Sequence, residues 1–219
     1  MANKQRREKA VTMERPSGRL LLLRHAESTW NVSGLWQGQA DPPLSESGVR
    51  SATALVASLE SYNFRLVCCS DLARARQTAE ILARGLGLKP PLVDGRLRER
   101  DVGRWAGLTD AEIERGWPGK LSEWRIEDDC MPAGGGEDSA VVLSRASACL
   151  DEMLAAAGGN RLLAVSHAGT IRVIDRALGG TGGQIPNLGG RWFQAHGSLL
   201  SSGGVFDAFE GEQAAQGRL

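Results

Sequence analysis

Four consecutive leucines end abruptly at two polar residues in LLLLRH, residues 20–25, and this pattern is the first indication of the fold. The same pattern recurs in LVCCSD, residues 66–71, and in LLAVSH, residues 162–167. Short apolar runs with polar ends are typical of strands that are buried on both faces of a parallel sheet. The chain is therefore expected to contain three such strands, each followed by polar side chains at its carboxyl end.

Helical patterns fill the intervals between these runs. Apolar residues recur at helical spacing in four segments, at residues 45–58, 71–85, 138–157 and 168–179. Ser45 and Asp71 stand at the N-cap positions of the first two segments. Alternating strands and helices predict an α/β fold, with three αβα layers built around a mostly parallel central sheet.

One segment interrupts the alternation. Residues 103–136 hold three tryptophans, two prolines and a Gly-Gly-Gly run. We expect this segment to form a lid or subdomain inserted into a single domain of residues 19–209. Residues 1–18 are expected to form a flexible basic N-terminal arm, and residues 210–219 a frayed tail.

The composition excludes several classes of protein. Lys+Arg and Asp+Glu both number 26, so the chain lacks the basic excess typical of nucleic-acid-binding proteins. The apolar run at residues 20–23 is too short for a signal-peptide core or a membrane span. The four cysteines form no C-x-x-C pair, and no histidine stands at ligand spacing from them. We therefore expect a cytoplasmic protein with no nucleic-acid partner, no membrane partner and no bound metal.

The polar ends of the expected strands gather histidines and arginines. Ligands of open α/β sheets bind outside the carboxyl ends of the strands. Arg24 and His25 end the first run, His167 ends the third, and Arg74 opens the helix after the second. A helix N-terminus and a guanidinium both favour anions. A lone histidine or arginine at such a place is commonly structural or solvated, but their combination favours an anion-binding site.

These residue types suit phosphoryl transfer, which depends mainly on positioning and on stabilisation of charge. A neutral imidazole is a competent nucleophile near pH 7, because its ordinary pKa is about 6.5. The leaving oxygen then needs a proton from a nearby carboxylic acid. The residues alone do not distinguish Glu99 from Asp101 or Glu112 for this role.

The stretch LRHAESTWN, residues 23–31, resembles the R-H-G-E-T-x-x-N signature of the histidine phosphatase superfamily, which includes the phosphoglycerate mutases. Further blocks follow in family order within residues 20–178: QG at 37–38, DPPLS at 41–45, SDLARARQTA at 70–79, LRE at 97–99, GRWAG at 103–107 and VSHAG at 165–169. Ala26 replaces a commoner glycine, and Ala106 stands where relatives often carry an acidic residue. Whether Asn187 matches the asparagine that relatives carry near the last strand is left open.

The resemblance implies a phosphoglycerate mutase-like fold and a role for each matching residue. His25 would be the phosphorylated nucleophile, and Glu99 would protonate the leaving oxygen and later activate water. Arg24, Arg74 and His167 would complete the catalytic set. The residues implied to bind the substrate are Arg24, Asn31, Gln37, Gly38, Arg74, His167 and Ala168. The family chemistry needs no metal, and no cofactor is expected for this chain.

The resemblance also favours one activity within the family. Its mutases carry a longer insertion between the acid and the second histidine, which closes over the site and excludes water. The shorter segment between Glu99 and His167 resembles the phosphatase branch. We expect a metal-independent phosphatase acting on a small phosphorylated metabolite, with a cofactor-dependent phosphoglycerate mutase and a non-catalytic binding module of the same fold as alternatives. Because relatives are often dimers, the resemblance also allows a homodimer.

Overall fold

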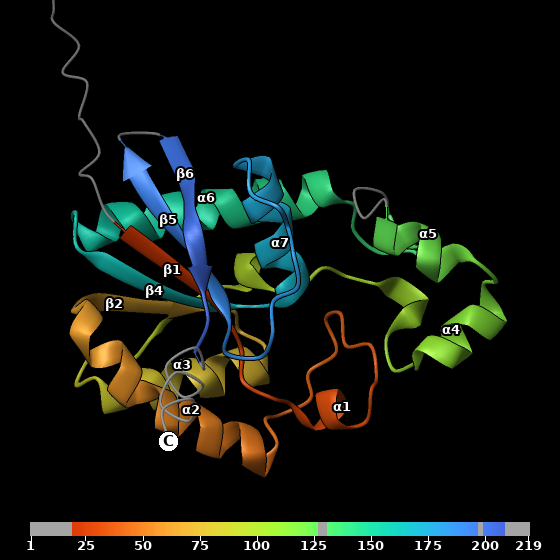
Figure 1. Ribbon diagram of the computed structural model, residues 1–219, viewed down its shortest axis with the longest axis horizontal. Helices are drawn as coiled ribbons and strands as arrows, with labels where there is room; N and C mark the ends of the chain where they lie inside the picture. Colours follow the sequence, from red (N-terminus) through yellow and green to blue (C-terminus); the bar gives the residue numbers. More distant parts are fainter. Residues whose placement is uncertain (1–18, 127–130, 197–198, 209–219) are drawn as a thin grey trace, which may run out of the picture.

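A six-stranded mixed sheet forms the centre of the computed structural model, which describes residues 19–126, 131–196 and 199–208 (Figure 1). Its strands lie in the order β3-β2-β4-β1-β5-β6. Their bounds are β1 Arg19–Arg24, β2 Phe64–Cys69, β3 Leu92–Val93, β4 Arg161–Ser166, β5 Gly190–His196 and β6 Leu199–Phe206. The arm expected at residues 1–18 and the tail expected at residues 210–219 lie outside the described residues.

The pairing of the strands confirms the expectation of a mostly parallel sheet. Strands β3, β2, β4 and β1 pair in parallel, and their three ladders hold the expected runs side by side. Strand β5 then pairs antiparallel with β1, and β6 pairs antiparallel with β5. Four parallel strands with an antiparallel extension at one edge are therefore consistent with the αβα prediction.

The four leucines of β1 explain why this strand is apolar throughout. Each of them is 0% exposed, and successive side chains point to opposite faces of the sheet. Leu21 and Leu23 belong to the hydrophobic core on one face, whereas Leu20 and Leu22 belong to the core on the other. A central strand with a core on each side has no face left for polar side chains.

Two pairs of helices cover the two faces (Figure 1). Helices α2 (Glu46–Leu59) and α3 (Ala73–Gly85) pack on the face that carries Leu21 and Leu23. Helices α6 (Ser139–Ala157) and α7 (Ala168–Ala177) pack on the opposite face. Among the residues that the structure describes, no helix combines the length and the apolar character needed to cross a membrane.

The structure confirms the N-cap expected for α2 but not the one expected for α3. The Ser45 hydroxyl accepts a hydrogen bond from the Gly48 N–H at 2.9 Å and caps α2, as expected. The expectation that Asp71 caps α3 is wrong, because its carboxylate instead pairs with Arg98 at 2.6 Å. The Ala73 N–H, at the start of α3, donates to the carboxylate of Asp41 from a distant segment.

The segment expected as an insert forms a small helical unit beside the sheet. After the short helices η2 (Gly95–Leu97) and η3 (Gly103–Trp105), it contains α4 (Asp110–Gly116) and α5 (Lys120–Ile126), which lie to the right in Figure 1. Trp105 and Trp124 are buried in a separate core of this unit. Trp36, which follows the short helix α1 (Thr29–Val32), packs against both, with ring centroids 5.7 and 5.4 Å away. The insert is therefore anchored to the segment around α1, and its action as a lid stays a prediction.

Candidate active site

The sheet brings two histidines together at the carboxyl ends of neighbouring strands. His25 follows β1 and His167 follows β4, and these strands pair in parallel with Arg24 opposite Ser166. The backbone N–H of His25 donates to the Ser166 carbonyl at 3.0 Å, and the two imidazole centroids are 5.2 Å apart. His25 is 3% exposed and His167 is 0% exposed. Two histidines far apart in the sequence therefore lie side by side, buried at the carboxyl ends of two central strands.

The hydrogen bonds of His25 define its tautomer. Its Nδ1 lies 2.6 Å from the Ala26 carbonyl oxygen, which can only accept, so Nδ1 carries the proton. Nε2 therefore has an available lone pair, and it accepts a hydrogen bond from the Arg74 Nε at 3.2 Å. Burial, followed by the positive charges of Arg74 and Arg24, lowers the pKa of His25 well below its ordinary value of 6.5. His25 is thus a neutral imidazole at pH 7, as a nitrogen nucleophile must be.

Arg74 is held rigidly beside this imidazole. It is the second residue of α3 and is 1% exposed. Its two Nη atoms donate to the carbonyls of Ala40 and Gly38 at 2.7 and 2.8 Å. Burial lowers the pKa of Arg74 to about 10, so the guanidinium stays charged at pH 7. A fixed cation of this kind can stabilise developing negative charge without reorganisation.

Arg24 supplies a second guanidinium at the end of β1. One Nη donates to the Ile185 carbonyl at 2.8 Å. Burial lowers the pKa of Arg24, while the carboxylate of Glu99 acts in the opposite direction. The opposite effects indicate that Arg24 and Glu99 lie close enough to interact through their charges.

His167 differs from His25 in its polar contacts. Neither of its ring nitrogens has a hydrogen-bond partner among the described residues, although both are buried. Burial and the charges of Arg74, His25 and Arg24 lower its pKa well below 6.5. Buried polar atoms in proteins are nearly always hydrogen-bonded, so an imidazole in this state is suited to bind a ligand.

Glu99 lies across the site at the N-terminus of α7. Its carboxylate accepts hydrogen bonds from the backbone N–H groups of Gly169 and Thr170, at 3.1 and 3.0 Å, and from that of Arg100 at 2.8 Å. Three backbone donors therefore fix the orientation of this carboxylate. Of the acids that the residues alone left open, Glu99 lines the same cavity as His25, whereas Asp101 and Glu112 do not.

A cavity of about 290 Å³ joins these groups. The residues expected at the site that line it are Arg24, His25, Asn31, Gln37, Gly38, Arg74, Glu99 and Ala168. His167 packs beside His25, at the margin of this lining. The structure thus brings together all the residues that the resemblance assigned to the site.

Several further residues surround the cavity that the sequence did not assign to the site. Arg100, Arg172, Trp30, Trp36 and Trp124 also line it. Arg172 could have been found from helical periodicity, because it lies one turn after Ala168 at the start of α7. Trp36 and Trp124 carried no comparable signal, because their place depends on how the insert packs. Trp30 lies within the signature stretch, directly before Asn31.

Asn187, whose match the sequence left open, also reaches the site. Its Nδ2 donates to the His25 carbonyl at 3.0 Å and to Asn31 Oδ1 at 3.3 Å. The position of Asn187 shortly before β5 was the signal that could have found this residue. Among the described residues, no three His, Cys, Asp or Glu side chains gather as a set of metal ligands.

Comparison with known proteins agrees with this geometry. The family model of the histidine phosphatase superfamily (branch 1) matches residues 20–191. The glucosyl-3-phosphoglycerate phosphatase of Mycobacterium tuberculosis (strain ATCC 25618 / H37Rv) is 38% identical over 168 residues, which cover 73% of this chain and 74% of that protein. A 2,3-bisphosphoglycerate-dependent phosphoglycerate mutase of Methylobacterium radiotolerans is 34% identical over 180 residues, which cover 77% of this chain and 83% of the relative.

A solved structure shares both the fold and part of the sequence. The mycobacterial glucosyl-3-phosphoglycerate phosphatase in complex with VO3 superimposes with a TM-score of 0.77 at 31% identity, covering 85% of this chain and 96% of the other. The family match spans the whole segment from β1 to the start of β5, including both histidines. The chain therefore belongs to the histidine phosphatase superfamily.

Proposed function

We propose that this chain hydrolyses a small phosphate monoester through a phosphohistidine formed on Nε2 of His25. The observation that carries this proposal is the state of that atom. Nε2 has a lone pair, belongs to a neutral buried imidazole, and lies 3.2 Å from the fixed guanidinium of Arg74. A nucleophile next to a cation and a second imidazole is suited to attack an anionic phosphoryl group.

In the first step, the Nε2 lone pair of His25 attacks phosphorus and the ester P–O bond breaks. The leaving oxygen takes a proton from Glu99, which acts as the general acid. Arg24, Arg74 and His167 stabilise the charge on the phosphoryl oxygens. The hydrogen bond from Nδ1 to the Ala26 carbonyl keeps the ring in position while it gains positive charge.

In the second step, the Glu99 carboxylate takes a proton from water, and the water oxygen attacks phosphorus. The N–P bond breaks, inorganic phosphate leaves, and His25 returns to its neutral form. Glu99 regains the proton that it gave up, so the cycle is balanced without a metal or a cofactor. The backbone donors at Gly169, Thr170 and Arg100 support this assignment, because they hold the carboxylate at the cavity.

The substrate that fits best carries a second polar or anionic group besides the phosphate. Arg100 and Arg172 line the cavity in addition to the two arginines next to the nucleophile, and Trp30, Trp36 and Trp124 provide aromatic walls. Glucosyl-3-phosphoglycerate, named in the mycobacterial relatives, combines a phosphate, a carboxylate and a sugar ring. It is the first candidate for this chain.

A phosphate-release assay over a panel of phosphorylated metabolites tests the function. It compares the wild type with His25→Ala, in the presence and absence of chelator. The wild type should release inorganic phosphate in both conditions, and His25→Ala should lose about a thousandfold or more of the activity. Activity that survives in the variant would exclude His25 as the nucleophile, and loss with chelator would contradict a metal-independent mechanism.

The same assay separates hydrolysis from the mutase alternative. Conversion of 3-phosphoglycerate to its isomer with negligible release of phosphate would identify a mutase. A cytoplasmic location, a homodimer and a lid formed by residues 103–136 remain predictions. Gel filtration with light scattering would show whether the protein is a homodimer.

A further inference from the structure

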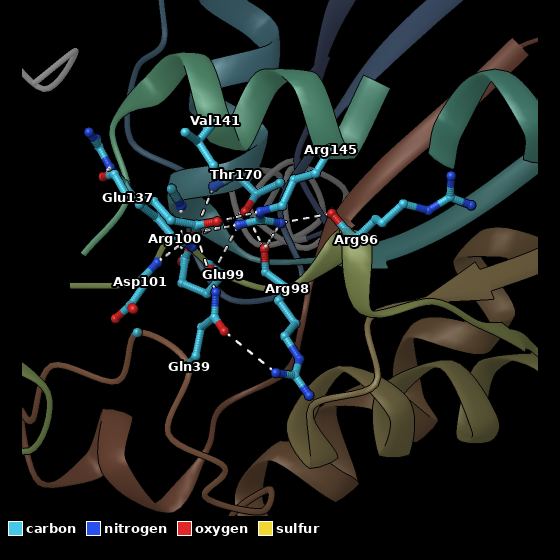
Figure 2. A network of polar contacts seen from close by, with 12 residues as sticks. Gln39, Arg96, Arg98, Glu99, Arg100, Asp101, Glu137, Val141, Arg145 and Thr170 are labelled. Atoms are coloured by element: carbon cyan, nitrogen blue, oxygen red, sulfur yellow. Dashed lines mark hydrogen bonds and ion pairs between the residues drawn. The ribbon is translucent and has the colours of Figure 1, made fainter. Parts of the chain in front are cut away.

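An ion pair lies next to the segment that carries Glu99 (Figure 2), and neither of its residues lines the cavity. Arg145 of α6 meets Glu137, which comes just before the N-cap of that helix. Two parallel contacts join them, from Nε to Oε1 and from Nη2 to Oε2, both at 2.8 Å. The side chains are only 16% and 17% exposed. This is the bidentate geometry in which an arginine and a carboxylate bind most specifically.

Arg145 also holds the backbone that leads to Glu99. Its Nη1 donates to the carbonyls of Arg96 and Arg98, both at 2.7 Å, and its Nη2 donates to the Glu99 carbonyl at 3.1 Å. Figure 2 shows these contacts converging on one guanidinium. A single side chain therefore satisfies carbonyls on three residues of the same segment.

Glu137 holds the backbone on the other side of Glu99. Its Oε2 accepts a hydrogen bond from the Asp101 N–H at 2.9 Å, and its own N–H donates to the Asp101 carbonyl at 3.0 Å. Its carbonyl accepts a hydrogen bond from Arg100 Nε at 2.9 Å. Burial acts to raise the pKa of Glu137, but hydrogen bonds from Arg145 and Asp101 outweigh it and lower the pKa, so the ion pair stays charged at neutral pH.

No regular secondary structure fixes this part of the chain. Residues 98–102 belong to no helix or strand, so no helical or ladder hydrogen bonds hold the backbone of Glu99. Ser166 and Thr170 add one hydroxyl contact each, to the carbonyls of Leu97 and Arg98. The ion pair contributes contacts both before and after Glu99. Its loss would remove those contacts, while the Glu99 side chain would keep its three backbone donors.

We propose that the Arg145–Glu137 ion pair positions Glu99 for proton transfer, by clamping the backbone on both sides of it. This inference rests on the proposed function, in which Glu99 is the acid. Neither Arg145 nor Glu137 lines the cavity, so they act as positioning residues through Glu99. Misplacing a catalytic group by about 1 Å can lower a rate about a hundredfold, so the effect is large enough to measure.

The leaving group of the substrate provides the test. An alkyl phosphate needs a proton on its leaving oxygen, whereas p-nitrophenolate is a weak base that leaves with little help. In Arg145→Gln, kcat/KM for an alkyl phosphate should fall by about ten- to a hundredfold. For p-nitrophenyl phosphate it should fall by less than about threefold. Glu137→Gln should show the same selectivity, and the double variant should lose little more than either single variant.

The controls use residues from the same part of the chain. Arg96 also pairs with α6, through Glu152 at 2.6 Å, but its side chain is 36% exposed and does not reach Glu99. Arg96→Gln should leave both substrates within about twofold of the wild type. Arg145→Lys keeps the charge without the planar fork, and should recover part of the loss only for the alkyl substrate. If Arg145→Gln does not fold, Glu137→Gln and Arg145→Lys carry the test.

Glu99→Gln serves as the reference for a missing acid. If this variant discriminates between the two leaving groups but the Arg145 and Glu137 variants lose both activities equally, or lose neither, the positioning role is refuted and the proposed function stands. If Glu99→Gln itself does not discriminate, Glu99 is not the acid, and the positioning role falls with that assignment. If Glu99→Gln, Arg145→Gln and Glu137→Gln all lose activity selectively on the alkyl phosphate, the result supports both the positioning role and the proposed function.

Discussion

Replacement of Arg74 by methionine tests the electrostatic part of the mechanism. The change removes three donors, one at 3.2 Å from His25 Nε2 and two at 2.7 and 2.8 Å from the carbonyls of Ala40 and Gly38. The loss of one preorganised donor typically costs about 3–4 kcal/mol in the transition state. We therefore expect kcat to fall by about a hundred- to a thousandfold in a phosphate-release assay.

The pH dependence of this variant gives a second, independent readout. The charge of Arg74 contributes to the low pKa of His25, so its removal raises that pKa towards the ordinary value. His25 must be neutral to attack, and kcat/KM falls where the free enzyme becomes protonated. The acidic limb of the kcat/KM profile should therefore move to higher pH. The deficit relative to wild type should be larger at about pH 5 than at about pH 8.

The stability of the variant separates catalysis from folding. Two carbonyls lose a donor, at about 1–3 kcal/mol each. Against this, the lowering of the pKa of Arg74 from 12.5 to about 10 corresponds to roughly 3 kcal/mol that burial of the cation costs. The free energy of unfolding should thus change by no more than about 3 kcal/mol.

Arg76→Met is the matched control, because Arg76 is exposed on the same helix. A loss of activity below about tenfold, or a large loss with an unmoved acidic limb, would refute the reasoning.

Three other outcomes are expected. Arg172→Ala should raise KM for phosphate esters that also carry a carboxylate, by about tenfold, and leave KM for p-nitrophenyl phosphate nearly unchanged; equal effects on both would remove Arg172 from substrate selection. Trp124→Ala should lower the free energy of unfolding by about 3–5 kcal/mol in urea titrations, because Trp124 is 5% exposed within the core of the insert. Because His25 and His167 have folded-state pKa values well below 6.5, the unfolded chain binds more protons below that pH. The free energy of unfolding should therefore be highest above about pH 6.5. Below that pH it should fall by about 1.4 kcal/mol per histidine for each pH unit, until the folded-state pKa is reached. His167→Asn should show a shallower fall, and an unchanged slope would contradict these pKa values.

The sequence was sufficient for the parts of the fold that depend on local patterns. The leucines of β1 predicted a strand buried on both sides, and they line both cores. Ser45 was recognised as an N-cap, because capping by a hydroxyl acts over three residues. The edge strands were not predicted. Strand β3 has only two residues, both exposed, and β6 contains Ser-Ser-Gly-Gly where an alternating pattern would be needed.

Features that depend on distant segments could not be derived in this way. Asp71 has the right residue type to cap α3, but Arg98 binds its carboxylate and Asp41 reaches the helix N-terminus instead. Trp36 stands far from the insert in sequence, yet it packs against Trp105. The clamp on Glu99 joins residues from α6 and the segment before it, and no periodicity marks those positions. For the proposed catalytic residues, family motifs supplied what local patterns could not.

The position of β1 also matters while the protein is being made. It is the first strand of the described chain to leave the ribosome, yet its neighbours β4 and β5 begin only at Arg161 and Gly190. Both edges of a strand of four leucines thus stay unpaired through most of translation, and unpaired apolar edges promote aggregation. A newly made chain therefore exposes β1 to aggregation until β4, and then β5, leave the ribosome.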